Sequence, residues 1–279
     1  YPGENDGFVY QKYNSVVNAL LYGCLNIMEK IAIDLDKKQD AIFYKNRYEK
    51  LKRSYLELFQ DPSNGLINDG HDTRHKSQHA NMFALAFGLI PKKNILDVVR
   101  YVKSKNMSCS VYGSQILLES LFDNGGSNHA IDLMRSKSER SWYNMIRYGS
   151  TITMEAWDKR YKPNLDLNHA WGGSPANIIV RKMMGVEPLS PGAKTIKINP
   201  RIGTLNFANL KTSFISGDVH VKCKQSVNNF IIEATIPGGI KANISVTANK
   251  GNNNLYLNGK LLDLEISDNQ YHLTDITTG

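Results

Sequence analysis

The sequence is poor in cysteine. Three cysteines occur in 279 residues, Cys24, Cys109 and Cys223, and they lie far apart. This odd number and wide spacing argue against a disulfide framework, and no Cys-x-x-Cys pair marks a metal clip. Cys24 falls on the apolar face of a predicted helix and Cys223 alternates within a predicted strand. We therefore predict both to be small buried hydrophobic side chains, and the redox compartment stays open.

Long apolar runs are also missing. The longest, such as 82–90, are too short to cross a bilayer, so we expect no transmembrane helix. The first residue is Tyr1, without a basic or apolar leader, and we expect a mature or trimmed segment whose targeting signal lies outside it. Walker and dinucleotide glycine patterns are absent, and no serine has the context of a nucleophile elbow.

The net charge of +8 is spread along the chain. The densest basic cluster is only Lys50–Arg53, which is typical of a solvated helix face. A basic helical protein that binds nucleic acid was the alternative, and the scattered charge does not favour it.

Helical spacing of apolar residues dominates the first 185 or so positions. It predicts helices over 15–31, 44–58, 77–89, 93–104, 114–122, 128–134, 142–147 and 174–184, with Ser15 as the first N-cap. The turn formers of 62–74 predict a loop. No fixed sequence repeat accompanies these helices.

The pattern changes at Gly185. Period-two alternation predicts strands over 194–199, 218–224, 229–236, 243–248 and 254–257, separated by Asn-Gly and Pro-Gly turns. Short strands at this spacing are typical of an antiparallel β-sandwich. We therefore predict a helical domain over 1–187 and a β domain over 188–279.

One stretch, 149–177, gathers the residues suited to chemistry. Glu155 lies close to Trp157, and His169 and Trp171 follow fourteen and sixteen residues later. All three tryptophans, including Trp142, fall within thirty residues. Carbohydrate sites use aromatic faces for sugar rings, imidazoles for hydroxyls and a carboxylate for the chemistry. The alternative is a Glu155 that only caps a helix or pairs with a nearby base, Arg147 or Lys159.

The histidines His71, His75 and His79 are spaced by four, as metal ligands on a helix would be. The turn formers around Gly70 place the first of them in a loop, and neither cysteine nor paired carboxylates complete a ligand shell. We therefore expect no metal. A loop that feeds histidines such as His79 to a pocket rim is the functional interpretation, and an ordinary solvated loop is the alternative.

Several blocks resemble the α-L-rhamnosidases of glycoside hydrolase family 78. They are HANMFALAFGLIP, CSVYGSQILLESL, GSTITMEAWD and KPNLDLNHAWGGSPANII, and their order and spacing cover essentially the whole chain. Family members have an (α/α)6-toroid catalytic domain followed by a β-sandwich. The resemblance therefore implies a multidomain protein, a partial (α/α)6-toroid helical domain followed by a C-terminal antiparallel β-sandwich.

The resemblance also implies inverting hydrolysis of terminal α-L-rhamnosyl bonds in an oligosaccharide or glycoside. Glu155 resembles the general base, His169 the histidine that binds sugar hydroxyls, and Trp142 an aromatic wall. Trp157, Trp171 and His79 are expected to complete the sugar subsite. The chemistry requires neither a metal nor an organic cofactor.

The chain departs from the family in three respects. The acid-rich segment that carries the general acid, Cys-Pro-x-Arg-Asp-Glu-Arg before Gly-Trp, is missing, and Glu4 or Asp6 would be poor substitutes. Met154 stands where many relatives carry tryptophan. Fewer helices are predicted than the six pairs of a closed toroid, so we expect a downstream portion that self-associates or pairs with the missing N-terminal portion.

Two further alternatives stay open. One is an inactive fragment that keeps a carbohydrate-binding subsite, and the other is a toroid glycosidase for another deoxy or neutral sugar. A periplasmic or secreted location would fit the family, but no signal is visible in this chain.

Overall fold

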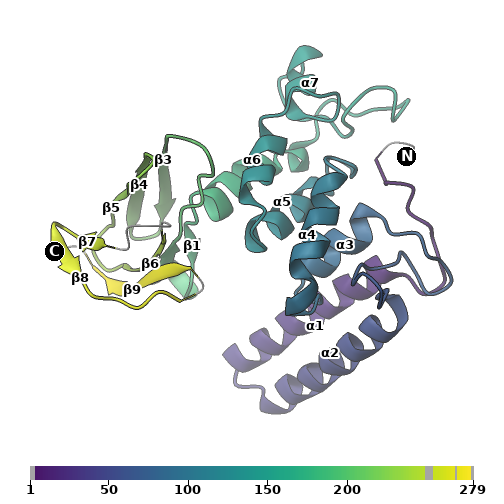
Figure 1. Ribbon diagram of the computed structural model, residues 1–279, viewed down its shortest axis with the longest axis horizontal. Coiled ribbons are helices and arrows are strands. Elements are labelled where there is room, and N and C mark those ends of the chain that lie inside the picture. The colour runs from purple at the N-terminus through teal and green to yellow at the C-terminus, as the bar shows by residue number, and fades with distance from the viewer. Residues whose placement is uncertain (1–3, 249–253, 268, 278–279) are drawn as a thin grey trace. The chain divides into compact units, whose positions relative to one another are not determined.

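The computed structural model describes residues 4–248, 254–267 and 269–277. The chain divides into two compact units, Tyr1–Ser174 and Pro175–Gly279. The first is helical and the second is built on β-sheets (Figure 1). This confirms the predicted order of a helical domain before a β domain, while the domain bounds 1–187 and 188–279 stay a prediction.

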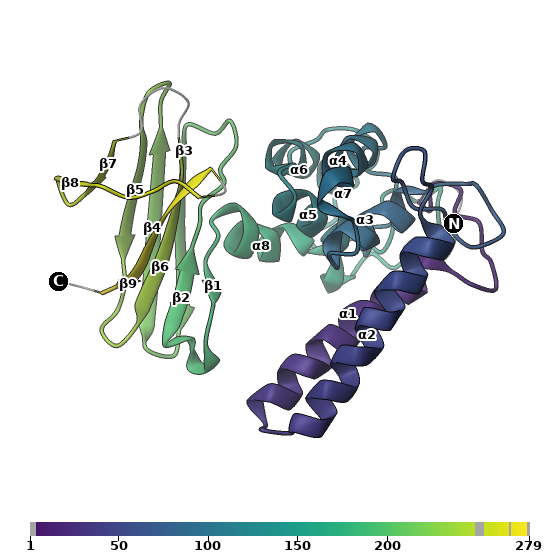
Figure 2. The same ribbon diagram turned by 60° about the horizontal axis from the view of Figure 1, so that its bottom comes forward.

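The helical unit contains seven complete α-helices among its described residues. They are α1 (Ser15–Asp34), α2 (Lys38–Phe59), α3 (Gln78–Ala86), α4 (Ile95–Ser104), α5 (Ser114–Asp123), α6 (Ser127–Met134) and α7 (Trp142–Arg147). Helix α1 packs against α2 and α3, α3 against α4 and α5, and α5 against α6 (Figure 2). The predicted helices are confirmed, but α2 begins six residues before the predicted start at residue 44.

Side-chain caps explain where several helices begin. Ser77 Oγ accepts from Ala80 N at 3.1 Å, and Ser141 Oγ accepts from Asn144 N at 3.2 Å. Such caps satisfy amides that have no partner within the helix. The cap of α1 is Asn14, not Ser15 as predicted, because Ser15 Oγ instead donates to the carbonyl of Asp69 at 2.9 Å.

Helix α1 differs from the sequence expectation in two ways. Within the described ranges it is the one helix whose length and apolar composition would suffice to cross a membrane, which a search for unbroken apolar runs missed. This is weak evidence, since core helices and signal sequences pass the same test. Cys24 is exposed and not buried, because α1 leaves part of its apolar surface, including Ile27 and Ile33, uncovered. The expected self-association stays a prediction.

The second unit begins with α8 (Ser174–Ile178), which continues as a π-helix over Ile179–Met183. A four-stranded sheet has the order β1-β2-β6-β9 and a three-stranded sheet the order β3-β4-β5, while β7 and β8 form a hairpin. The strands are β1 (Glu187–Pro188), β2 (Thr195–Ile198), β3 (Phe207–Phe214), β4 (Gly217–Gln225), β5 (Phe230–Thr235), β6 (Lys241–Thr247), β7 (Leu255–Leu257), β8 (Lys260–Leu262) and β9 (Gln270–Ile276).

The strand predictions are partly wrong. The sequence reasoning missed β1, β3, β8 and β9, and it predicted only antiparallel pairing. Strands β2 and β6 run parallel, with Ile196 opposite Ala242 and Ile198 opposite Ile244. Alternation of side chains gives the same signal in both directions, so it could not reveal this pair. One hydrophobic core, which includes Ile196, Val221 and Ala242, takes side chains from both larger sheets.

Candidate functional site

Two neighbouring stretches of irregular backbone bring Glu155 and His169 together. The amide of Glu155 donates to the carbonyl of Asp166 at 3.0 Å, and the amide of His169 donates to the carbonyl of Thr153 at 2.8 Å. Thr153 Oγ1 also donates to the carbonyl of His169. These bonds pair 153–155 with 166–169 in antiparallel fashion, so residues fourteen apart in sequence share one site.

The Glu155 carboxylate is held in its ionised form. Lys162 Nζ forms an ion pair with Glu155 Oε1, and the amide of Asp166 donates to Oε2 at 3.3 Å. The hydrogen bond from Lys162 lowers the pKa of Glu155, and it outweighs the opposing effect of desolvation. The side chain is 24% exposed and that of Lys162 is 16% exposed. Glu155 therefore pairs with a lysine, but not with either base expected from the sequence.

Trp171 supplies an exposed aromatic face beside His169. Its side chain is 62% exposed, and its ring lies 4.5 Å from that of His169 and 5.2 Å from that of Tyr112. Tyr112 is also exposed, and the sequence reasoning did not include it in the site. It lies in a block used only for the family resemblance. Such exposed rings are suited to stacking on a sugar.

The two ring nitrogens of His169 have different surroundings. Its Nδ1 lies 3.6 Å from the carboxylate of Asp166. Its Nε2 is buried and has no hydrogen-bond partner among the described residues. Buried polar atoms are nearly always hydrogen-bonded, so an orphaned nitrogen beside an aromatic face points to a polar ligand.

Trp142 and Trp157 pack against each other next to the segments that carry this site. Trp157 is fully buried, and its Nε1 donates to the carbonyl of Cys109 at 2.7 Å. Its ring meets that of Trp142 edge to face at 4.9 Å. Trp142 is half-buried, and its Nε1 donates to the carbonyl of Gly172 at 2.8 Å. A buried indole has no face for a sugar ring, so only Trp142 and Trp171 retain surface for stacking.

Gly172 is required where the chain passes closest to this cluster. A Cβ at this position would lie 2.8 Å from Val111 and 2.9 Å from Thr153. Real Cβ atoms avoid such approaches, so any larger residue would push apart the segments that carry Thr153 and His169.

Asp158, three residues after Glu155, lies at the centre of a cluster of polar side chains. Its carboxylate accepts hydrogen bonds from Asn144, Tyr148 and Arg160. Burial raises the pKa of Asp158, but the bonds led by those from Arg160 outweigh it and lower the value to about 2. The segment after Glu155 is thereby tied to α7.

His79 occupies a separate environment in α3. Burial lowers its pKa, and its Nδ1 has no hydrogen-bond partner among the described residues. Phe8 lies beside it at 6.4 Å between ring centroids. His71 pairs with Asp72 and His75 with Asp69, so the three histidines do not form one stripe. In the described part of the chain no group of three or more His, Cys, Asp or Glu residues is placed to hold a metal ion.

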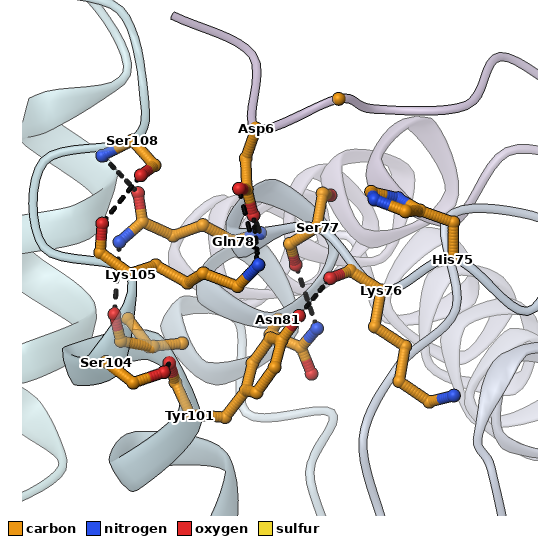
Figure 3. Close-up of polar contacts among 12 residues, drawn as sticks. Asp6, His75, Lys76, Ser77, Gln78, Asn81, Tyr101, Ser104, Lys105 and Ser108 are labelled. Carbon is orange, nitrogen blue, oxygen red and sulfur yellow. Dashed lines mark hydrogen bonds and ion pairs between the residues drawn. The ribbon is translucent and has the colours of Figure 1, made fainter. Parts of the chain in front are cut away.

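The N-terminal segment crosses the helical unit and reaches the Glu155 segment. Asp6 Oδ2 accepts from the amide of Gln78 at 2.7 Å and lies 3.3 Å from Lys105 Nζ, between α3 and α4 (Figure 3). Two residues earlier, Glu4 Oε1 accepts from the amide of Trp157 at 2.8 Å. Sequence reasoning missed this contact, because nothing in the local pattern around Glu4 marks a partner 153 residues away.

A cavity of about 700 Å³ lies in the β unit, lined mainly by aliphatic side chains of β5, β6, β7 and β9. Its described lining residues include Asn229, Asn254 and Tyr256 but no acid and no histidine. The described lining therefore lacks the groups for acid–base chemistry, whereas the segments that carry Glu155 and His169 have them.

Sequence comparison assigns the chain to a family. The profile of the bacterial alpha-L-rhamnosidase 6 hairpin glycosidase domain matches residues 1–183, and that of the bacterial alpha-L-rhamnosidase C-terminal domain matches residues 185–255. The chain therefore belongs to the bacterial alpha-L-rhamnosidase family, as the resemblance indicated.

Individual relatives agree with this assignment. An alpha-L-rhamnosidase of Alteromonas sp. (strain LOR) is 25% identical over 244 residues, which cover 82% of this chain and 26% of that protein. One from Formosa agariphila is 23% identical, covering 95% of this chain and 30% of that protein. The chain thus spans between a quarter and a third of the length of these curated relatives.

Solved structures show the same fold. The alpha-L-rhamnosidase from Dictyoglumus thermophilum superposes with a TM-score of 0.79 at 20% identity, covering 91% of this chain and 30% of that one. The Streptomyces avermitilis alpha-L-rhamnosidase complexed with L-rhamnose superposes with a TM-score of 0.78 at 20% identity, covering 98% of this chain and 27% of that one.

Proposed function

We propose that this chain carries the general-base side of an inverting α-L-rhamnosidase site, with Glu155 as the base. In inverting hydrolysis, one carboxylate activates water on the face of the sugar opposite the leaving oxygen, which a carboxylic acid protonates. The observation that carries the proposal is the ionised Glu155 carboxylate, paired with Lys162 beside the orphaned nitrogen of His169. A general base must be deprotonated before it can accept a proton from water.

The neighbouring groups fit recognition of a deoxy sugar. His169 Nε2 is available to a hydroxyl group, and the exposed ring of Trp171 offers an apolar face to the ring or its methyl group. Trp142 would form a second wall, and Trp157 would hold Trp142 in place from below. The family membership and a relative complexed with L-rhamnose support this choice of sugar. The role of His79 in the sugar subsite stays a prediction, since its described ring contact is with Phe8.

At the level of the fold, we propose that α1 to α7 form part of an (α/α)6 toroid and that the two larger sheets form a β-sandwich, with domains over 1–187 and 188–279. The helical neighbours α1–α2 and α3–α5 and the core shared by both sheets support this arrangement. A terminal α-L-rhamnosyl group on an oligosaccharide or glycoside would be the substrate.

Hydrolysis of an aryl α-L-rhamnoside by the chain and by Glu155→Gln tests the proposal. An activated aryl leaving group needs little protonation, so it reports on the base. Loss of a general base lowers kcat about 100- to 10,000-fold. Glu187→Gln is a matched control, because Glu187 is also ion-paired and shielded but lies in the β unit. Proton NMR of the first product should show β-L-rhamnose, and a retained α configuration would refute inversion.

A second candidate function is carbohydrate binding without hydrolysis. It is favoured by the exposed ring of Trp171 and the orphaned Nε2 of His169, which suit the binding of a sugar and require no second carboxylate. Calorimetric titration with L-rhamnose separates the two: binding without turnover in the parent would establish a binding fragment, whereas turnover that is lost in Glu155→Gln establishes the glycosidase.

A further inference from the structure

The carboxylate of Glu4 is buried in an unusual place. The residue is only 5% exposed, and it belongs to an irregular segment and not to a helix or strand. Acids are almost never fully buried without a partner. Its Oε1 accepts the amide hydrogen of Trp157 at 2.8 Å. The contact joins two segments that are 153 positions apart in the sequence.

Contacts of neighbouring residues fix the segment that carries Glu4. Asp6, two residues on, binds the amide of Gln78 and the ammonium group of Lys105. The amide of Val9 donates to the buried carboxylate of Asp69 at 2.9 Å. Glu4 is therefore presented to Trp157 by a segment that is itself anchored to α3 and α4 (Figure 3).

The hydrogen-bond donor, the Trp157 amide, lies two residues after Glu155, so its position affects the backbone at Glu155. On one side of Glu155, Thr153 is bonded to His169 through backbone and side chain. On the other side, the amide of Trp157 is the next backbone donor that the structure ties to another segment, and its acceptor is Glu4. A shift of this amide would move the backbone of Glu155, two residues away.

We propose that Glu4 is a positioning residue for the reaction at Glu155: its carboxylate fixes the Trp157 amide and thereby sets the place of the Glu155 side chain. The inference rests on the proposed function of Glu155. Glu4 is not assigned as the general acid, because it is buried and its oxygen is committed to a backbone amide.

The charges around Glu4 agree with such a role. Burial raises its pKa, the Trp157 amide and the guanidinium group of Arg140 oppose the rise, and Glu155 adds to it. Burial also raises the pKa of the Cys109 thiol and keeps it neutral. The two carboxylates repel each other, so loss of the charge on Glu4 should lower the pKa of Glu155 and move the acid-side limb of the pH profile to lower pH.

Three variants separate the anchor from the charge. Glu4→Gln keeps an oxygen that accepts the Trp157 amide but removes the charge, and Glu4→Ala removes both. Asn5→Ala is the matched control, since its side chain bonds to Gly7 within the same turn. Hydrogen exchange of the peptide that contains Trp157 and kinetics with an aryl α-L-rhamnoside are measured for each.

We expect Glu4→Ala to expose the Trp157 amide to exchange and to lower kcat about 10- to 100-fold with little change in KM, since small displacements of a reacting group have effects of this size. Glu4→Gln should keep the amide protected and kcat near that of the parent, with the acid-side limb of the pH profile moved to lower pH. Asn5→Ala should match the parent in every measurement.

Two results would overturn the inference. One is an equally protected Trp157 amide in Glu4→Ala and the parent. The other is an equal loss of kcat in Glu4→Gln and Glu4→Ala. Exchange decides the anchoring whether or not the parent hydrolyses the substrate. A parent without turnover therefore counts against the proposed function, and its exchange data still decide for or against Glu4.

Discussion

Substitution by phenylalanine is expected to affect stability differently at the two tryptophans Trp157 and Trp171. Trp157 is fully buried, donates to the carbonyl of Cys109 and packs edge to face on Trp142. Trp157→Phe removes that donor and leaves the buried carbonyl without its partner, which costs about 1–3 kcal/mol. The two ring carbons that are also lost were worth about 0.8 kcal/mol each.

Together these losses predict that Trp157→Phe lowers the free energy of unfolding by about 3–5 kcal/mol. For a unit of this size, a change of that magnitude lowers the melting temperature by about 10 °C. Trp171 is the matched control, since it is mainly exposed and its indole nitrogen has no hydrogen-bond partner among the described residues. Trp171→Phe should change stability by less than about 0.5 kcal/mol.

Calorimetric melting and urea unfolding followed by circular dichroism at a helical wavelength would measure both variants in the whole chain. The reasoning fails if Trp157→Phe unfolds within about 1 kcal/mol of the parent, or if Trp171→Phe is equally destabilised. In the proposed function, Trp171→Phe should instead weaken the binding of L-rhamnose. Trp157 would thus contribute to stability and Trp171 to sugar binding, although the sequence analysis predicted the same role for both.

Two further predictions concern charge. Lys162→Met removes the hydrogen bond that lowers the pKa of Glu155, so the acid-side limb of the kcat–pH profile should move to higher pH, while the exposed Lys159→Met leaves it in place. A profile unchanged by Lys162→Met would contradict the ion pair. Asp158 has a pKa lowered from 3.8 to about 2, so its contribution to stability is present above about pH 4 and is lost as the pH falls towards 2. Urea unfolding at pH 7 and pH 3 should show that Asp158→Asn loses about 2 kcal/mol at pH 7 and less at pH 3, unlike Asp132→Asn in an exposed ion pair.

The helical part of the fold was predictable because its signals are local. Apolar spacing and breaks at glycine, proline and asparagine located α1 to α7 within a few residues, apart from the start of α2. The same approach missed β3, in which Ala208 and Leu210 alternate with polar residues over only part of the strand. It also missed the parallel β2–β6 pair, since strand direction depends on a distant partner and not on the strand's own residues.

The candidate site was predicted in composition but not in arrangement. The clustering of three tryptophans around Glu155 indicated this region, and the pairing of 153–155 with 166–169 brings Glu155 and His169 together. Which tryptophan is buried could not be read from the sequence, because Trp157 and Trp171 each follow an alanine within a polar segment. Burial depends on what packs over a side chain.

The sequence by itself determined the family, the order of a helical unit before a β unit, and the acid around which the candidate site is built. These follow from residue types and short-range spacing. Only the tertiary structure decided that Lys162 is the partner of Glu155, that Trp157 supports the site while Trp171 is open to solvent, and that Glu4 holds the Trp157 amide. Each of these depends on contacts between segments whose separation in space the local sequence does not encode.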